Sequence, residues 1–234
     1  MAYNKKITNI IKILRYLPWT LYFNFKFLPF NQAIKLPVLL YKPQMQNNTG
    51  KYIIRGKVSY GMIRLGFPTV SIFPNTGIIL ENRGTIVFQG KCKIGNNSAI
   101  SLGEKGYMTL GNGFVCSTGL KLICYNKVDI GEVVRIGWNV VIMDTDFHSM
   151  KLVDSTKKSK GYGPISIGNH IWIGSFCKIY KHSVIPDWCT VSSNTIVKQP
   201  IVAQPYSVIY NPSTTESKYI GRYRDPYDDK IMYE

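Results

Sequence analysis

Aliphatic residues recur at every sixth position in the C-terminal half of the chain. The run comprises Ile167, Ile173, Ile179, Ile185, Val191 and Val197. A helix repeats its apolar positions about every 3.6 residues and a strand about every second residue, so neither produces this spacing. Hexapeptide repeats are typical of β-helices, in which three faces of six residues make a coil of about eighteen residues. The pattern therefore predicts an all-β parallel β-helix with one large aliphatic side chain per face.

Small or β-branched residues stand two positions before most of these aliphatic residues, which suits a narrow interior. They are Ile171, Cys177, Ser183, Cys189 and Thr195. The register continues upstream through Ile142, Ile136 and Ile130, and it is looser between residues 101 and 129. From residue 52 to residue 93 the β-branched and glycine residues are irregularly spaced, as expected of atypical terminal coils.

The repeat is interrupted once in the late coils. Twenty-five positions separate Ile142 from Ile167 where six are expected, so nineteen residues are inserted. We predict a loop insertion over residues 144–166. An insertion between coils leaves the prism and can carry function.

The N-terminal region predicts a cap. Residues 4–17 place apolar side chains at helical spacing, and we expect Pro18 to end this short amphipathic helix. Residues 19–43 mix aromatic and aliphatic groups with prolines, which favours an extended segment, and residues 44–51 predict a loop. The predicted units are therefore a cap over residues 1–51, a β-helix over 52–210 and a tail over 211–234.

Composition favours one elongated domain with anionic partners. The 234 residues include 29 Lys and Arg against 13 Asp and Glu, a formal net charge of +16. Nucleic acid, an anionic lipid surface and a phosphate-rich cofactor all fit this charge. The helix at 4–17 carries Lys5, Lys6, Lys12 and Arg15, so it can either pack on the end of the β-helix or dock on an anionic membrane.

Cysteine usage and hydropathy predict the compartment. The five cysteines match no zinc or disulfide spacing, and Cys177 and Cys189 fall on interior positions, so we expect reduced core residues. An interior sulfur is also poorly placed for an acyl-enzyme mechanism. No apolar run is long enough to cross a bilayer and the N-terminus does not read as a signal peptide. These features predict a cytoplasmic protein, with peripheral contact at the inner membrane face left open.

Four motifs in this order carry a resemblance to a known family. They are the hexads, D-T-D-F-H-S at 144–149, I-W-I-G-S at 171–175 and P-Y-S-V-I-Y-N-P at 205–212. Together they resemble the left-handed β-helix acyltransferases, specifically acetyl-CoA-dependent sugar and xenobiotic O-acetyltransferases, over about residues 52–222. The segment W-T-L-Y-F-N-F-K-F-L-P-F resembles the N-terminal region of capsule and lipopolysaccharide acetyltransferases. The left hand comes from the resemblance alone, because the general crossover rule predicts the right-handed form.

The resemblance implies a set of catalytic residues. His148 matches the family's catalytic histidine, and imidazole suits a general base because it ordinarily titrates near neutral pH. Asp144 or Asp146 can accept from the other ring nitrogen and fix the tautomer, and the spacing leaves the choice between them open. His170 and His182 fall at outer corners, where we expect solvated turn residues. The three histidines lack the spacing of the related zinc carbonic anhydrases, so no metal is expected.

The resemblance also implies a cofactor site. Trp172, Gly174 and Ser175 match the groove for the pantetheine arm, with an N–H near Ser175 as the oxyanion donor. Lysines on late coils and in the tail are expected to meet the phosphates of coenzyme A. They are Lys178, Lys181, Lys198 and Lys218. The tail departs from the family pattern, because Tyr210 precedes Asn211-Pro212 where a small residue is usual and the following cation is delayed to Lys218.

These inferences predict a homotrimeric acetyltransferase that moves the acetyl group of acetyl-CoA to a sugar hydroxyl of a surface polysaccharide or its precursor. N-acetylation of a nucleotide-linked amino sugar and acetylation of a xenobiotic are the alternatives within the fold. The non-enzymatic alternative is a basic anion-binding scaffold. A carbohydrate acceptor is expected as partner, and nucleic acid is not.

Overall fold

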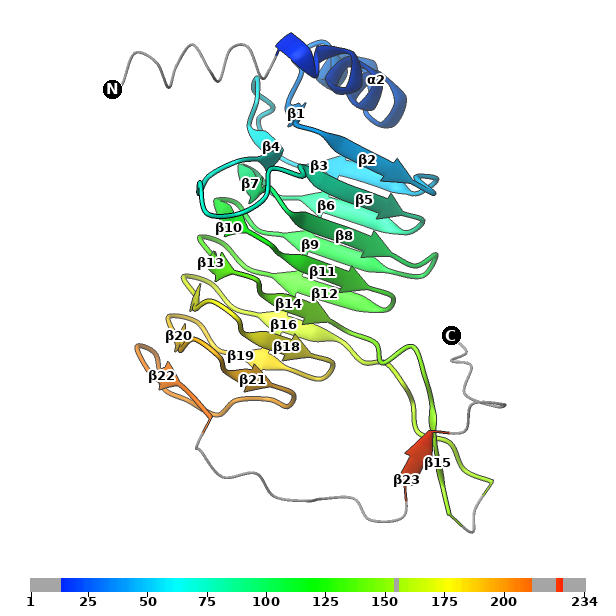
Figure 1. Cartoon of the computed structure of the whole chain (residues 1–234), viewed down its shortest axis with the longest axis vertical. Helices are drawn as coiled ribbons and strands as arrows, with labels where there is room; N and C mark the ends of the chain where they lie inside the picture. The colour runs from blue at the N-terminus through cyan, green and yellow to red at the C-terminus, as the bar shows by residue number, and fades with distance from the viewer. Residues whose placement is uncertain (1–13, 154–155, 212–221, 225–234) are drawn as a thin grey trace.

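A computed structural model describes residues 14–153, 156–211 and 222–224 of the chain. The chain winds through three parallel sheets that form the faces of a prism (Figure 1). Sheet A contains β1 Val38–Leu40, β4 Ile63–Phe67, β7 Cys92–Gly95, β10 Phe114–Thr118, β13 Arg135–Trp138, β17 Trp172–Ile173, β20 Thr190–Val191 and β22 Val208–Ile209. Sheet B contains β2 Pro43–Gln46, β5 Ile78–Asn82, β8 Ser98–Leu102, β11 Lys121–Cys124, β14 Val141–Met143, β18 Lys178–Tyr180 and β21 Ile196–Val197. Sheet C contains β3 Lys51–Ile54, β6 Thr85–Phe88, β9 Tyr107–Leu110, β12 Lys127–Ile130, β16 Ile165–Ile167 and β19 Val184–Ile185.

The pairing register confirms coils of eighteen residues in the late part of the prism. Trp172 lies beside Thr190, which lies beside Val208, so successive partners are eighteen positions apart. Earlier coils are longer, because Cys116 pairs with Ile94, twenty-two positions away. The looser spacing between residues 101 and 129 reflects these longer coils. The all-β, parallel architecture expected from the sequence is confirmed.

The interior is filled as the hexads predict. All six aliphatic hexad residues and all five small residues that precede them are at most 2% exposed. The five cysteines are buried and form no disulfide. Burial raises the pKa of the Cys116 thiol to about 12, so the thiol stays protonated and unreactive at neutral pH. The prediction that the cysteines are reduced core residues is therefore confirmed.

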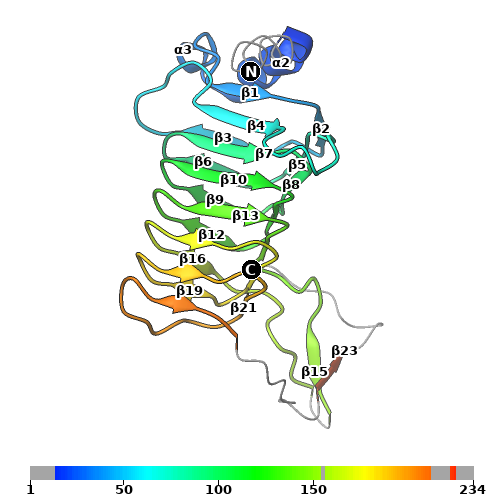
Figure 2. The ribbon, with the colours of Figure 1, turned by 60° about the vertical axis from the view of Figure 1, so that its left-hand side comes forward.

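The N-terminal cap is helical, which corrects the prediction of an extended segment over residues 19–43. Helix α2 covers Leu17–Phe27 and α3 covers Phe30–Ala33, and both lie across one end of the prism (Figure 2). Pro18 lies in the first turn of α2 instead of ending a helix, because the first N–H groups of a helix need no intrahelical acceptor. Most of the predicted helix at 4–17, including Lys5, Lys6 and Lys12, lies outside the described residues.

Helix α2 closes the open end of sheet A through two buried polar side chains. Asn24 donates from Nδ2 to the Val38 carbonyl at 2.8 Å, and its Oδ1 accepts from the Val38 N–H at 3.2 Å. Thr20 Oγ1 accepts from the Leu40 N–H at 3.1 Å. These bonds replace the strand that the first strand of a ladder lacks on its outer side. The prism therefore starts at β1, not at residue 52, and residues 44–51 include strand β2 in place of a simple loop.

Left-handed backbone recurs at the corners of the late coils. Every sixth residue there has a positive φ angle, and none of them is glycine. They are His170 (57°), Phe176 (63°), His182 (67°), Trp188 (61°) and Asn194 (61°). Such a conformation costs a bulky residue about 1–3 kcal/mol, which the ladder bonds and the packed interior on either side must offset.

Among the described helices, none combines the length and apolarity needed to cross a bilayer.

Strand β3 offers a matched test of the prism interior. Ile54 is 5% exposed and its neighbour Ile53 is 38% exposed, since adjacent side chains of a strand point to opposite faces.

We expect Ile54→Ala to lower the free energy of unfolding by about 2–5 kcal/mol, because it leaves a cavity in the core. Ile53→Ala should change it by less than about 1 kcal/mol. Guanidinium unfolding followed by circular dichroism measures both. Equal losses for the two variants would contradict the assigned faces of this strand.

Candidate functional site

The predicted insertion leaves the prism at the end of β14 and returns at β16. It extends away from the late coils and carries β15 Met150–Leu152, which pairs antiparallel with β23 Arg222–Arg224 (Figure 1). Its two limbs are held together near the prism, where the Asp146 N–H donates to the Gly161 carbonyl at 2.7 Å. Close by, the Gly163 N–H donates to the Asp144 carbonyl at 3.0 Å. The insertion is therefore a braced arm at the corner between sheets B and C.

Asp144 anchors the base of this arm. Its side chain is buried, and its two oxygens accept the N–H groups of Tyr125 and Asn126, each at 2.8 Å. Those residues belong to the turn after β11, one coil away. Burial raises the pKa of Asp144, and the backbone N–H donors oppose that shift. Both oxygens of the carboxyl group therefore bind the arm to the neighbouring coil.

Asp146 forms an ion pair with Lys181, the residue that follows β18 at the same corner. The two side chains are 44% and 24% exposed, respectively. The pair joins the arm to the next coil. Lys181, which we expected to meet coenzyme A phosphates, thus also contacts a catalytic candidate.

His148 lies on the arm just before β15 and is half-buried. The turn that leads to it is shaped by Phe147, whose φ is 59° and whose N–H donates to Thr145 Oγ1 at 3.0 Å. The Phe147 ring packs edge-on against Tyr125, with centroids 4.9 Å apart. The position of His148 is therefore set by the same coil that holds Asp144.

The other two histidines lie at corners, as the sequence predicts, but neither is merely solvated. His182 caps the return of the arm: its N–H donates to the Pro164 carbonyl at 2.9 Å, and its ring lies over Gly163 with no room for a side chain there. Sequence reasoning missed this contact. The one signal in the sequence is that His182 directly follows Lys181, which pairs with Asp146 of the arm. His170 lies at the corner between sheets C and A, stacked on Trp188 at a centroid distance of 3.9 Å.

Trp172, Gly174 and Ser175 lie together near the corner between sheets A and B. Trp172 points outward from β17 and is 60% exposed. A side chain at Gly174 would come within 2.6 Å of the Ser193 nitrogen, so the turn requires glycine. Ser175 Oγ accepts from the Trp138 N–H at 3.0 Å. No hydrogen bond from the Ser175 N–H is found within the described part of the chain.

The remaining predicted cations that the structure describes lie on or next to sheet B. Lys178 is exposed on the outer surface of β18, and Lys198 is exposed directly after β21. Lys218 lies outside the described residues.

A single chain does not bring His148 together with Trp172, Gly174 and Ser175. The group around His148 lies at one edge of sheet B, and the group around Trp172 lies beyond the other edge. Six residues of extended chain separate Ser175 from Lys181, a span of up to about 20 Å. Figure 1 shows the arm leaving on one side of the prism and the strands of sheet A on the other.

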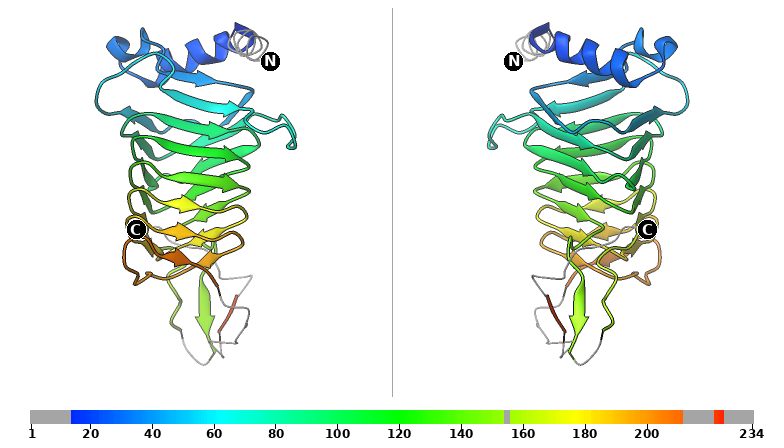
Figure 3. Two further views of the ribbon diagram at one scale, coloured as in Figure 1. Left: turned by 90° about the vertical axis from the view of Figure 1, so that its left-hand side faces the viewer. Right: turned by 90° about the vertical axis from the view of Figure 1, so that its right-hand side faces the viewer.

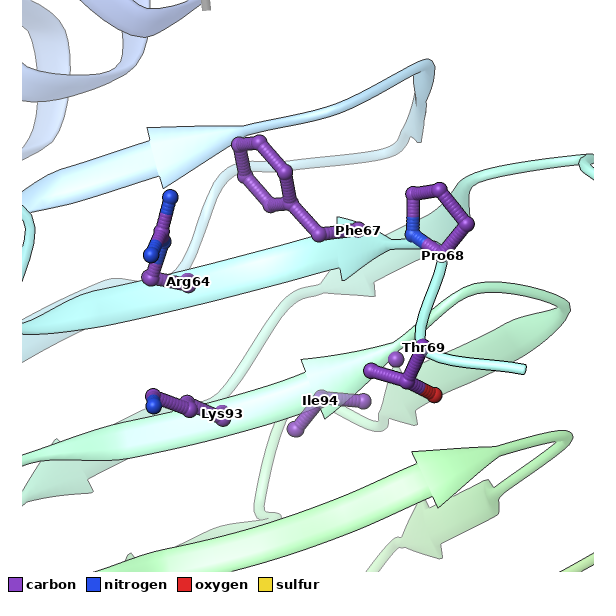
Figure 4. Close-up of a pocket in the computed structure, with 7 residues that line it drawn as sticks. Arg64, Phe67, Pro68, Thr69, Lys93 and Ile94 are labelled. Carbon is purple, nitrogen blue, oxygen red and sulfur yellow. The ribbon is translucent and has the colours of Figure 1, made fainter. Parts of the chain in front are cut away.

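The outer surface of sheet A carries a column of cations that sequence reasoning did not identify. Arg64 pairs with Lys93, and both lie in register with Arg135, which pairs with Trp172. The eight strands of this sheet contain no acidic residue. A hollow of about 170 Å³ is lined by Arg64, Lys93 and residues 67–69, where β4 ends and the next loop begins (Figure 4). The pairing register of the strands aligns these residues. A period of six does not predict this register in the irregular early coils.

No group of three or more His, Cys, Asp or Glu side chains in the described residues could hold a metal ion.

No family model, curated protein or solved structure matches this chain.

We expect Asp144→Ala to lower the free energy of unfolding by about 2–4 kcal/mol, because two buried N–H groups lose their acceptors. Asp146→Ala, which removes an exposed ion pair, should cost less than about 1 kcal/mol. Denaturant unfolding of both variants measures the difference, and equal costs would contradict the anchoring role.

The same pair of proteins predicts a pH dependence. Because burial raises the pKa of Asp144, the folded state holds this proton more tightly than the unfolded chain. The stability advantage of the wild type over Asp144→Ala should therefore narrow as the pH rises from about 4 through the raised pKa. Unfolding curves recorded across this range measure the narrowing. If the stability advantage of the wild type widened as the pH rose, the raised pKa of Asp144 would be contradicted.

Proposed function

We propose that this protein is an acetyl-CoA-dependent acetyltransferase of the left-handed β-helix type, which acts on a sugar hydroxyl of a surface polysaccharide or its precursor. The observation that carries the proposal is the arm between β14 and β16. It is the long interruption of the late coils, it is braced by a buried carboxyl group, and it presents a half-buried histidine at the prism surface.

The proposed reaction is direct transfer in a ternary complex. His148 takes the proton of the acceptor hydroxyl while the oxygen attacks the thioester carbonyl carbon. The Ser175 N–H donates to the oxyanion of the tetrahedral intermediate. As the intermediate collapses, the carbon–sulfur bond breaks and the imidazolium returns its proton to the departing sulfur. The products are the acetyl ester and coenzyme A, and no residue is acylated.

The two acidic candidates take different roles in this proposal. Asp144 positions the arm, because both of its oxygens accept backbone N–H groups. Asp146, which forms an ion pair with Lys181, remains the candidate that orients His148. Lys178 and Lys198 are the described cations that would meet coenzyme A phosphates.

The site is proposed to lie between two copies of the chain in a homotrimer. The arm of one copy would bring His148 to Trp172 and Ser175 of the next copy, because sheet B separates these groups within one chain. A cyclic assembly repeats the same pairing at each interface.

We expect His148→Ala to reduce kcat by about 10²–10⁴-fold and to leave coenzyme A affinity nearly unchanged, since the histidine contacts the acceptor and not the nucleotide. His170→Ala is the matched control, because His170 stacks on Trp188 at another corner; its kcat should stay within a few-fold of wild type. Steady-state kinetics with acetyl-CoA and purified glycans measure both. Turnover of His148→Ala near the wild-type value would overturn the mechanism.

We expect mixed trimers of His148→Ala and Trp172→Ala to recover activity that neither variant has alone. Each mixed trimer has one interface in three that combines an intact histidine with an intact tryptophan from the neighbour, so about a third of wild-type activity should return. Co-expression with two affinity tags isolates the mixed species. Mixed trimers without recovered activity would place the two residues in one chain's site or outside the site altogether.

The cation column of sheet A favours a second candidate function, a scaffold that binds an anionic polymer. Arg64, Lys93 and Arg135 line one acid-free face. Coenzyme A separates the two functions: a ligand at about 100 times its Kd should add about 2.7 kcal/mol to the stability of the acetyltransferase. A scaffold without a cofactor groove would show no such gain.

A further inference from the structure

The outer face of the helical cap is apolar, although nothing in the described residues covers it. We call this surface the cap face. It comprises Trp19, Leu21, Tyr22, Phe25, Phe30 and Ile34. Phe30 is 73% exposed and Ile34 is 55% exposed. Figure 3 shows α2 and α3 lying across the end of the prism, opposite to the end from which the arm extends.

Four rings of the cap face contact one another in two pairs. Trp19 and Tyr22 meet at a centroid distance of 6.3 Å, and Phe25 and Phe30 meet at 6.2 Å. The inner face of α2 is already used, because Phe23 is fully buried and Asn24 bonds to β1. A helix that is apolar on both faces is normally covered on both. Within residues 14–153, 156–211 and 222–224, only one face is covered.

Charge around the cap face identifies what would cover the other. The first eighty residues contain eleven Lys and Arg and no Asp or Glu, so all thirteen acidic residues follow residue 80. Arg15, Lys26 and Lys35 are exposed beside the cap face. None of these three side chains takes part in an ion pair with another described residue. A second copy of the same surface would bring like charges together, whereas an anionic surface would neutralise them.

We propose that the cap face docks on an anionic lipid bilayer. Trp, Tyr and Phe side chains favour the boundary between headgroups and acyl chains, and flanking Lys and Arg side chains bind anionic headgroups. Helix α2 has eleven residues and would lie in the plane of this boundary. The prism would then stand on the membrane with the arm away from it. This inference does not depend on the acetyltransferase chemistry.

The test is flotation of the full-length chain with vesicles of phosphatidylcholine alone or mixed with phosphatidylglycerol. We expect the wild type to float with the anionic vesicles and to remain unbound with phosphatidylcholine alone. Phe25→Gln combined with Phe30→Gln should lower the partition coefficient at least about tenfold, because two rings no longer leave water. Lys26→Gln combined with Lys35→Gln should also lower it about tenfold or more.

Tyr206→Gln combined with Tyr210→Gln is the matched control, since these rings are 78% and 70% exposed and lie in the late coils. Its partition coefficient should stay within about twofold of the wild-type value. All substituted side chains are exposed, and circular dichroism checks that each variant folds.

Absence of binding to anionic vesicles, or equal binding of the two aromatic double variants, would overturn the proposal. So would a self-associated species in sedimentation that only the Phe25→Gln, Phe30→Gln variant loses, because a second copy would then cover the cap face. Acetyl transfer to a soluble acceptor should be the same in the wild type and in the two double variants of the cap. A defect in flotation with intact transfer therefore separates this proposal from the proposed function.

Discussion

The structure depends on the width of the prism interior. Three sheets converge on a space that admits about one large aliphatic side chain from each face of each coil, so Ile173, Ile179 and Ile185 fill successive faces of a single turn of the chain. Parallel ladders then fix the vertical position of every coil on the one before. Because both constraints repeat every eighteen residues in the late coils, any additional chain must leave at a corner.

The arm follows from this constraint, and so does the way in which it is held. An arm attached only by its two ends would hold His148 in no fixed position relative to the prism. Asp144 supplies the missing restraint by accepting two backbone N–H groups from the preceding coil, at the cost of burying a carboxyl group. The ion pair from Asp146 to Lys181 adds a contact to the following coil. A rigid repeat and a short polar tether together place one imidazole at a defined corner of the prism.

How much the sequence predicts varies along the chain for physical reasons. The late coils were predictable because Ile167 to Val197 keep a strict period of six, and the arm was predictable because that period breaks once. The early coils were not, since they are longer and of unequal length, as the pairing of Leu40 with Leu65 shows. Helix α2 was missed because apolar residues on both of its faces erase the periodicity that marks a helix. The candidate residues of the site could be named from a resemblance, but their separation by sheet B depends on which corner each occupies. The roles of Asp144 and Arg64 depend on contacts with other coils, which no local pattern encodes.

The bonds from Thr20 and Asn24 to β1 have a consequence for assembly along the prism axis. A stack of parallel strands exposes unpaired N–H and C=O groups at both ends, and two such ends would let molecules join without limit into a fibre. With the β1 edge of sheet A occupied by side chains of the protein's own helix, that route of growth is closed in one direction. Contact through the opposite ends could join two molecules through sheet A, but this sheet could not extend past β1, so one short helix makes its growth finite.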